Sequence, residues 1–219
     1  MPLMSRRAFA CAGLATAAGC LLSACAGGDQ NAPAATTSAA ASPATSSAPD
    51  APYAKGIHHA TISVESFGDI QLELNATIAP VTVANFAQLA EEKFYDGLTF
   101  HRIVKGFVIQ GGDPTGTGRG GSSKSIVGEF EANGHANTIS HTRGTISMAR
   151  SQDYDSASSQ FFICVADAPN LDGSYAAFGH VTSGMEVVDA IVDAAKPQDS
   201  NGTIAPEDQP RISSVRMVD

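Results

Sequence analysis

The sequence predicts a mainly β protein, a closed barrel of strands whose open ends are covered by two α-helices. Three observations lead to this fold class. Several short segments alternate apolar and polar side chains, which is the period of a half-buried strand. Two isolated segments have the helical period instead, one near residue 85 and one near residue 190. Gly, Asp and Asn separate the strand segments, as is typical of β-rich domains.

Residues 1–24 have the pattern of an export signal. Arg6 and Arg7 precede an apolar run of about 15 residues, shorter than the ~20 residues of a membrane-spanning helix. "SRRAF" resembles the twin-arginine export motif, and general secretion is the alternative route. "LSAC" resembles the bacterial lipobox, which predicts a signal peptide ending before an acylated Cys25. Cys20 is a weaker candidate because alanine replaces the large apolar lipobox residue, and an ordinary cleaved signal peptide is the remaining alternative.

Residues 25–54 are rich in Ala, Ser, Thr and Pro and have almost no large apolar side chain. Such a segment buries too little apolar surface to offset the entropy lost on ordering, so we predict a disordered tether. Residues 55–219 then form one folded domain, which is long enough for a single core. These segments together predict an extracytoplasmic protein that is attached to the bacterial cell membrane by its lipid anchor alone.

The charge of the chain argues against nucleic acid and anionic lipid as electrostatic partners. There are 13 Lys and Arg against 22 Asp and Glu, a formal net charge of −9. Removal of the leader takes away two arginines and no acid, which leaves 11 basic and 22 acidic side chains. A surface this acidic repels phosphate groups.

The folded domain opens with a predicted hairpin. "HATISVES" and "DIQLELN" alternate apolar and polar residues on either side of Phe67 and Gly68. The helical period follows Pro80, with Glu91 and Glu92 on the polar face. The apolar face of this predicted helix comprises Val83, Phe86, Ala87, Ala90 and Phe94.

The remaining strand candidates are "LTFHRIVKGFVIQGG", "GTISMAR", "SSQFFICVA" and "AAFGHV", in chain order. "GMEVVDAIVDAA" is the second predicted helix, with Met185, Val188 and Ile191 spaced for packing on one face. "RISSVRMV" alternates again and is the last predicted strand.

Several common catalytic patterns lack their context. "GTGRGG" fits a dinucleotide-binding pattern, but no helical period follows it, so we interpret it as a glycine loop. The six histidines lack the helical pairing with glutamate that marks zinc hydrolases, and G-x-S-x-G of serine hydrolases is absent. If the leader is removed and Cys25 is acylated, Cys164 is the one cysteine that keeps a free thiol. The sequence therefore predicts neither an internal disulfide nor a metal bound by cysteines. We therefore expect no metal and no cofactor.

Arg102 lies among apolar residues in "FHRIVKGFVIQGG". Arginine is seldom buried without a partner, so its presence there calls for a function. Gln110 is a candidate partner that would orient the guanidinium without neutralising it. We expect Phe107 and Phe162 to pack in the barrel core and also to line a cleft.

Four motifs identify a family resemblance: "FHRIVKGFVIQGG" (100–112), "GTISMAR" (144–150), "SSQFFIC" (158–164) and "LDGSYAAFGHV" (171–181). In this order and spacing, the whole folded domain resembles the cyclophilin family of peptidyl-prolyl cis-trans isomerases. The resemblance implies a closed eight-stranded antiparallel β-barrel capped by two α-helices. It also implies a monomer that needs no cofactor and acts on proline-containing segments. Because the leader predicts export, we expect these segments to belong to exported proteins.

The resemblance implies three catalytic residues, namely the family's catalytic arginine at Arg102, with Gln110 and Phe107 beside it. Gln110 and Gln160 match groups that hold the arginine and the substrate backbone, and the main chain at Ala149 and Arg150 matches a segment that pairs with the peptide. The residues implied to bind substrate are Val108, Ala149, Arg150, Gln160, Phe162, Leu171 and Tyr175.

Physical chemistry independently supports such a role for an arginine. An X–Pro bond rotates slowly because the nitrogen lone pair is delocalised into the carbonyl, with a barrier of ~18–20 kcal/mol. A guanidinium N–H near the prolyl nitrogen favours the twisted state, in which the lone pair is localised. A thousandfold acceleration requires about 4 kcal/mol.

The sequence departs from the family pattern at a few positions. Asn170 stands where cyclosporin-sensitive members have tryptophan, so we expect weak cyclosporin binding. Val108 replaces a commoner methionine, and Arg150 replaces a common asparagine. The alternative function is a non-catalytic chaperone or adaptor that binds proline-containing peptides on the same fold. A solute-binding lipoprotein is poorly supported, because one domain of this size leaves no room for two closing lobes.

Overall fold

The computed structural model describes residues 51–219. The predicted signal peptide (1–24) and the predicted acylation site Cys25 lie outside the described residues, as does most of the predicted tether. The last four tether positions, 51–54, pack on the domain: Ala54 is buried, and the Tyr53 hydroxyl donates to Oε1 of Glu91 over 3.5 Å. No helix within the described range is long and apolar enough to cross a membrane.

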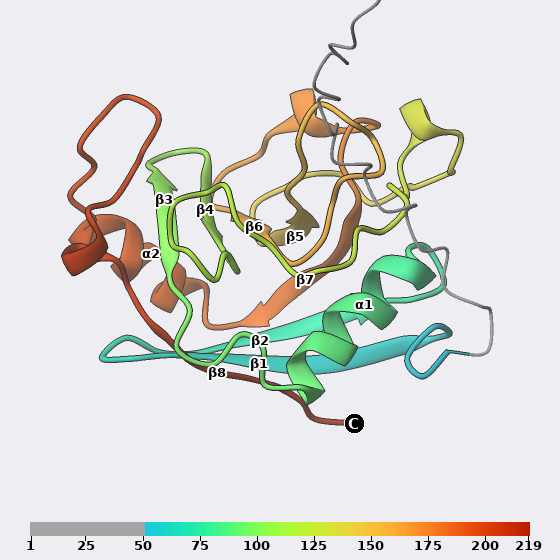
Figure 1. Cartoon of the computed structure of the whole chain (residues 1–219), viewed down its shortest axis with the longest axis horizontal. Coiled ribbons are helices and arrows are strands. Elements are labelled where there is room, and N and C mark those ends of the chain that lie inside the picture. The colour runs from blue at the N-terminus through green and yellow to red at the C-terminus, as the bar shows by residue number, and fades with distance from the viewer. Residues whose placement is uncertain (1–50) are drawn as a thin grey trace, which may run out of the picture. The chain divides into compact units, whose positions relative to one another are not determined.

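Eight strands form one antiparallel sheet in the spatial order β3-β4-β6-β5-β7-β2-β1-β8, which curls around the core (Figure 1). This confirms the predicted eight-stranded antiparallel architecture with two helices. The opening hairpin is present as predicted, whereas the stretch from Leu98 to Gly112 contains two strands joined by a turn at Gly106. The strands are β1 (Ile57–Val64), β2 (Gly68–Asn75), β3 (Phe100–Val104), β4 (Val108–Gly111), β5 (Thr145–Met148), β6 (Phe161–Cys164), β7 (Ala177–Ser183) and β8 (Ile212–Met217).

The two edge strands of the sheet, β3 and β8, are joined by a few backbone contacts near the start of each strand. Thr99 and Arg211 form an isolated antiparallel bridge. The Ile212 N–H donates to the Leu98 carbonyl over 2.7 Å, and the Phe100 N–H donates to the carbonyl of residue 210 over 2.9 Å. The sheet is therefore a half-barrel whose edges meet through these hydrogen bonds instead of a full strand ladder.

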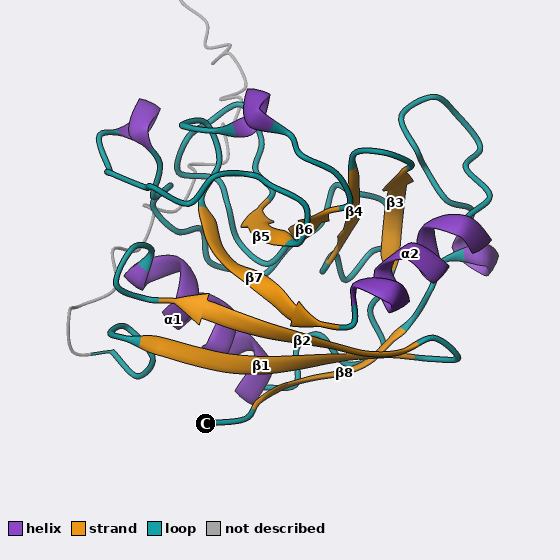
Figure 2. Ribbon diagram, turned by 180° about the vertical axis from the view of Figure 1, so that it is seen from behind, coloured by secondary structure: helices purple, strands orange, loops and turns teal. Residues whose placement is uncertain are grey.

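Helix α1 (Pro80–Glu91) and helix α2 (Met185–Ala194) lie at opposite ends of the sheet, as both ribbon views show (Figures 1 and 2). Proline suits the first turn of a helix, because the N–H groups of that turn have no acceptor within the helix and the lack of one costs no hydrogen bond. The free N–H groups of Val81 and Thr82 donate to the buried carboxylate of Glu129 over 3.0 and 2.8 Å. A distant acidic side chain therefore caps α1, and its charge suits the positive end of the helix.

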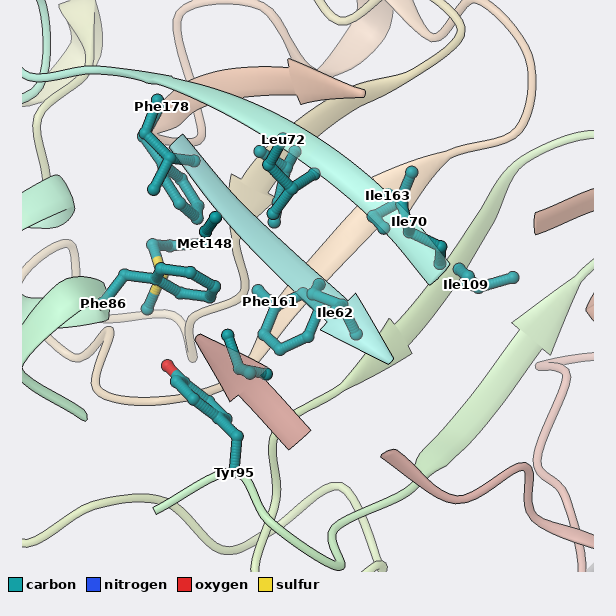
Figure 3. Close-up of a cluster of buried hydrophobic side chains, with 14 of the residues drawn as sticks. Ile62, Ile70, Leu72, Phe86, Tyr95, Ile109, Met148, Phe161, Ile163 and Phe178 are labelled. Atoms are coloured by element: carbon teal, nitrogen blue, oxygen red, sulfur yellow. The ribbon is translucent and has the colours of Figure 1, made fainter. Parts of the chain in front are cut away.

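The main core lies inside the curled sheet, where aliphatic side chains surround a group of aromatic rings (Figure 3). Phe161 on β6 packs edge-on against Phe86 of α1 and against Tyr95, with ring centres 5.7 and 5.6 Å apart. The Tyr95 hydroxyl donates to the Ser159 carbonyl over 3.2 Å, and burial raises the pKa of this phenol. The core thus fixes α1 and the start of β6 to each other.

Strand alternation produces a second apolar cluster on the outer face of the sheet. Successive side chains of a strand point to opposite faces, so Phe161 and Ile163 enter the core while Phe162 points outward. The expected packing of Phe107 and Phe162 in the barrel core was therefore wrong, because both belong to the outer cluster. The buried members of this cluster are Val108, Phe162, Cys164, Ala168 and Leu171, and Phe107, Ala149 and Tyr175 pack against them.

Candidate active site

A cavity of about 110 Å³ lies over the outer cluster and is lined by residues of β3, β4, β6 and the segment that follows β5. These strands are neighbours in the sheet (Figure 2). A cavity of about 150 Å³ holds benzene, so this one has the size of a smaller ring. Nine of the ten residues predicted for the site line the cavity, and Gln160 lies beside it. The lining residues are Arg102, Phe107, Val108, Gln110, Ala149, Arg150, Phe162, Leu171 and Tyr175.

Strand register brings the lining residues together. Arg102 of β3 pairs with Gln110 of β4, and Gln110 pairs with Phe162 of β6 on its other side. Directly opposed residues of an antiparallel sheet share a face, so all three side chains point outward. The register shifts between Phe100 and Arg102, and this irregularity lets Phe100 enter the core while Arg102 faces the cavity.

A chain of hydrogen bonds fixes the guanidinium of Arg102. Its Nη1 donates to Oε1 of Gln110 over 3.2 Å, and the Gln110 amide donates to Oε1 of Gln160 over 2.9 Å. The Gln160 amide in turn donates to the Gly120 carbonyl over 2.7 Å. On the other side, Nε of Arg102 donates to the Asn201 carbonyl over 2.8 Å. Every one of these acceptors is neutral, so the positive charge of the arginine is kept.

Asn201 was not predicted as part of the site, because it contributes only a backbone carbonyl. The carboxylate of Asp199 accepts the N–H groups of Asn201 and Thr203 over 2.9 and 3.0 Å, which folds this segment into a turn. The "DSNGT" composition could have predicted a turn, but not its contact with a strand about a hundred residues earlier.

The environment of Arg102 is half-buried and partly aromatic. Burial lowers the pKa of its guanidinium, and Tyr175 and Asp199 oppose that change. Arginine nevertheless stays protonated in proteins. Its Cζ lies 5.9 Å from the centre of the Phe107 ring, within the range of a cation–π contact. The site therefore combines one permanent cation with an apolar wall.

The ring of Phe162 is held from two sides. His141 stacks on it with ring centres 5.9 Å apart, and Tyr175 meets it edge-on at 5.8 Å. His141 is itself fixed, with Nδ1 2.8 Å from Asp172 and Nε2 3.0 Å from the Ser147 hydroxyl. Burial lowers the pKa of His141, and Asp172 opposes this shift.

Ser147, His141 and Asp172 have the connectivity of a hydrolase triad, but the serine is inaccessible. Ser147 has 0% exposure, so its hydroxyl supports the ring stack and does not reach a substrate. Cys164 is also unsuited to nucleophilic chemistry, because burial raises the pKa of its thiol to about 12. This supporting role of His141 was not predicted, since the histidines were weighed only as metal ligands. Within residues 51–219, no group of three His, Cys, Asp or Glu side chains could hold a metal.

Arg150 is the centre of an aromatic cage. Its Cζ lies 4.9 Å from the ring centres of both Phe130 and Tyr154, and 4.8 Å from that of Tyr175. Its Nε and Nη2 donate to the Ser174 carbonyl over 3.0 and 2.8 Å. Only the main chain of Arg150 was predicted to have a role. Its side chain also contacts Tyr175 in the cavity wall and the rings of Phe130 and Tyr154 in two other loops.

A second cavity of about 440 Å³ adjoins the first and shares Gln110, Ala149 and Arg150 with it. Its rim includes the glycine loop of residues 116–121, which is not followed by a helix. Burial raises the pKa of Asp113 at the base of this loop, but N–H groups of Thr115 and Gly120 outweigh that effect and lower it. The residues lining this cavity are Gln110, Gly118, Arg119, Gly120, Ala149, Arg150, Ser151, Ser156, Ser158 and Gln160.

Comparison with known proteins identifies relatives of this site and fold. Residues 59–217 match the family model described as "Cyclophilin type peptidyl-prolyl cis-trans isomerase/CLD". The chain is 50% identical over 123 residues to peptidyl-prolyl cis-trans isomerase B of Bacillus subtilis (strain 168), which covers 56% of this chain and 82% of that protein. It is 47% identical over 135 residues to a peptidyl-prolyl cis-trans isomerase of Helicobacter pylori (strain ATCC 700392 / 26695), covering 61% and 79%.

Solved structures show the same fold. A crystal structure of a Cryptosporidium parvum cyclophilin-type isomerase superposes with a TM-score of 0.66 at 30% identity, covering 75% of this chain and 99% of that one. A second structure of that protein, obtained in the presence of the dipeptide Ala-Pro, gives a TM-score of 0.65 at 31% identity and covers 74% and 99%.

Proposed function

The chain belongs to the family of cyclophilin-type peptidyl-prolyl cis-trans isomerases and has that enzymatic activity, and we propose that it acts on X–Pro bonds of exported proteins with Arg102 as the catalytic group. One observation carries the mechanism: a guanidinium held by neutral acceptors faces a cavity of ring size that has an apolar wall. The proline ring would occupy this cavity, against Phe107, Val108, Phe162 and Leu171.

In the proposed mechanism, Arg102 stabilises the twisted state of the X–Pro bond. As the bond rotates, the lone pair becomes localised on the prolyl nitrogen, which then accepts a hydrogen bond. Of the five N–H groups of an arginine, Arg102 uses one on Nε and one on Nη1 for its protein contacts. The others have no partner in the described part of the chain. A donor that gains its acceptor only in the transition state lowers the barrier selectively.

The substrate backbone would pair with the segment that follows β5. The Ala149 N–H is already used, because it donates to the Gln160 carbonyl over 2.9 Å. By contrast, the N–H of Arg150 has no hydrogen-bond partner among residues 51–219, nor do the carbonyls of Ala149 and Arg150. These groups suit an extended peptide that adds to the strand edge. Alignment of this kind would hold the X–Pro bond next to Arg102.

A proline-isomerisation assay on the chain without its leader (residues 26–219) tests this proposal. We expect Arg102→Ala to lower kcat/KM about a thousandfold, because the variant loses the donor that stabilises the twisted X–Pro bond. This factor corresponds to about 4 kcal/mol of transition-state stabilisation. Arg102→Lys should recover little of the rate, since an ammonium lacks the rigid fork of the guanidinium. A variant that keeps both its fold and the wild-type rate would refute the mechanism. Binding of proline peptides without turnover by the wild-type protein would favour the adaptor alternative.

We also propose that the protein is an extracytoplasmic lipoprotein acylated on Cys25, a position outside the described residues. The support is the "LSAC" pattern behind a twin-arginine leader and the Ala/Ser/Thr/Pro segment that follows. Cys25→Ala should abolish incorporation of a labelled fatty acid and release the protein from the membrane fraction. Cys20→Ala is the matched control and should leave labelling intact. Labelling that persists in Cys25→Ala would refute this assignment.

A further inference from the structure

We propose that the second cavity selects substrates with an acidic side chain, Asp or Glu, shortly before the proline, and that Arg119 binds its carboxylate. This inference rests on the proposed function, with proline in the first cavity, and on a peptide direction that places the preceding residues in the second cavity. The two cavities are continuous, since they share Gln110, Ala149 and Arg150. The unpaired backbone groups at Ala149 and Arg150 lie at their junction.

Charge is segregated around the two cavities. The chain has a formal net charge of −9, yet the charged side chains that line these cavities are all arginines: Arg102, Arg119 and Arg150. No carboxylate of the described residues lines either cavity. An acidic protein with a cationic groove attracts an anionic group to that groove. Clustering of this kind within an otherwise acidic chain points to the sign of the ligand.

Two of these arginines are committed to other contacts. Arg102 contacts Gln110 and Asn201, and the N–H groups that it leaves free face the first cavity, where the proposed mechanism assigns them to the prolyl nitrogen. Arg150 donates to the carbonyls of Ser174 and Ser151 and is enclosed by three rings, so it has few N–H groups left for a ligand. They contribute to the positive potential and leave the direct contact to the third arginine.

Arg119 has a free guanidinium. It is exposed at the rim of the second cavity, and its side chain has no hydrogen bond or ion pair within residues 51–219. The carboxylate of Asp113, at the base of the same loop, is engaged by the N–H groups of Thr117 and Gly120. A free guanidinium can bind a carboxylate with two parallel hydrogen bonds.

Apart from its arginines, the second cavity is lined by uncharged residues, mostly serine, glycine and glutamine. The hydroxyl of Ser151 donates to that of Ser156 over 2.8 Å, and the Ser156 hydroxyl donates to the Asp153 carbonyl over 2.6 Å. The Ser158 hydroxyl has no hydrogen-bond partner in the described region and can donate to a second carboxylate oxygen. Among the described residues of this lining, the Ser158 hydroxyl and the Arg119 guanidinium are therefore the two side-chain donors without a partner that are offered to an acid.

The position of Arg119 is set by the loop beneath it. A side chain at Gly120 would bring a Cβ within 2.1 Å of Oδ1 of Asp113, so the loop packs tightly on this carboxylate. Asp113 also accepts the N–H groups of Thr117 and Gly120, on either side of Arg119, over 3.1 Å each. The backbone of Arg119 is therefore held, and only its side chain must be ordered by the substrate.

A peptide series tests the inference. In an alanine-based peptide with one proline, Glu, Gln or Lys is placed in turn at each of the three positions before proline, and isomerisation is followed by NMR exchange. At one position, we expect kcat/KM for Glu to exceed that for the isosteric Gln about threefold to fivefold, the range of a partly exposed ion pair. Lys should fall below Gln at that position, and salt should reduce the difference.

Variants assign the effect to Arg119. Arg119→Gln should bring the ratio of Glu to Gln peptide to one, and Arg119→Glu should reverse the preference so that the Lys peptide is favoured. Lys93→Gln removes the same charge just after α1, outside both cavities, and should leave the ratio unchanged. Each ratio is referred to the all-alanine peptide measured with the same variant.

The outcomes separate the two proposals. Failure of the wild-type protein to isomerise the all-alanine peptide would contradict the proposed function. Turnover of that peptide with equal rates for Glu and Gln at all three positions would overturn the acidic preference alone. A preference that survives in Arg119→Gln, or that is lost equally in Lys93→Gln, would overturn the role of Arg119.

Discussion

Arg102 of β3 and Gln110 of β4 face each other across the sheet, and Nη1 of the arginine donates to Oε1 of the glutamine over 3.2 Å. The glutamine orients the guanidinium and leaves its charge uncompensated. Its own amide group donates to Gln160, which determines which end of the Gln110 side chain faces the arginine.

Gln110→Glu tests the need for a neutral partner. A carboxylate of the same shape would form an ion pair with Arg102 and compete for the N–H groups proposed to reach the substrate. We expect kcat/KM to fall at least tenfold, about 1.4 kcal/mol, with little change in the urea midpoint. Gln88→Glu, on the exposed side of α1, is the control. Full activity of Gln110→Glu would show that neutrality of this contact is unimportant.

Arg150→Ala tests the aromatic cage. Loss of the guanidinium removes the cation that three rings enclose and frees Tyr175, which forms part of the cavity wall. We expect a stability loss of about 2 kcal/mol, and a rise in KM larger than the fall in kcat, because the wall is loosened while Arg102 is retained. Arg143→Ala, which breaks an exposed pair with Asp189, is the comparison. Equal effects of the two substitutions on KM would contradict this role.

The dependence of stability on pH should reveal the buried histidines. Burial lowers the pKa of His101, with Asp113 opposing and Arg102 adding to the shift, and burial also lowers the pKa of His141. The unfolded chain therefore binds these protons more readily than the folded one. Stability should be complete above the unfolded value of about 6.5 and decrease as the pH falls below it.

His101→Leu provides the measurement. Both ring nitrogens of His101 are buried without a hydrogen-bond partner, so an apolar replacement of similar size removes a cost of protonation and leaves no donor stranded. Urea unfolding between pH 7.5 and 5 should show a shallower loss of stability in this variant than in the wild-type protein. A slope identical to that of the wild type would assign the effect to other groups. Carboxylates whose pKa is lowered, such as Asp113, act only at more acidic pH.

Cyclosporin sensitivity is expected to be low because of Asn170. This exposed residue precedes Leu171, at the wall of the first cavity, and the family resemblance implies a tryptophan at its position in cyclosporin-sensitive members. An amide provides neither the area nor the rigidity of an indole ring. Asn170→Trp should therefore strengthen inhibition at least tenfold while proline isomerisation stays similar. Nanomolar inhibition of the unmodified protein would contradict the expectation.

Much of the fold could be predicted from sequence because its periods are local. The hairpin of β1 and β2 and the two helices follow directly from alternation and helical spacing. The division of "FHRIVKGFVIQGG" into two strands was less visible, since the turn at Gly106 interrupts an almost continuous apolar run. The face on which Phe162 lies depends on the register of β6, and "QFFIC" is apolar on both faces.

The position of the candidate site was predictable for side chains in a recognisable motif, such as Arg102 and Gln110, which line the cavity. It was not predictable where contacts are long-range or made by the backbone. The Asn201 carbonyl has no sequence signal, and His141 reaches the Phe162 ring only once β5 and β6 have paired. Arg150 stood out only as a departure from the family pattern, with no local sign that Phe130 and Tyr154 would enclose it.

The two apolar clusters on opposite faces of one sheet make the protein sensitive to insertions. A single extra residue within β6 would carry Phe161 outward and Phe162 inward, exchanging the contents of the hydrophobic interior and the catalytic wall in one step. Insertions there should therefore abolish folding and activity together. Point substitutions on the outer face can change substrate preference while the interior keeps its packing, which makes that face the practical place to engineer the enzyme.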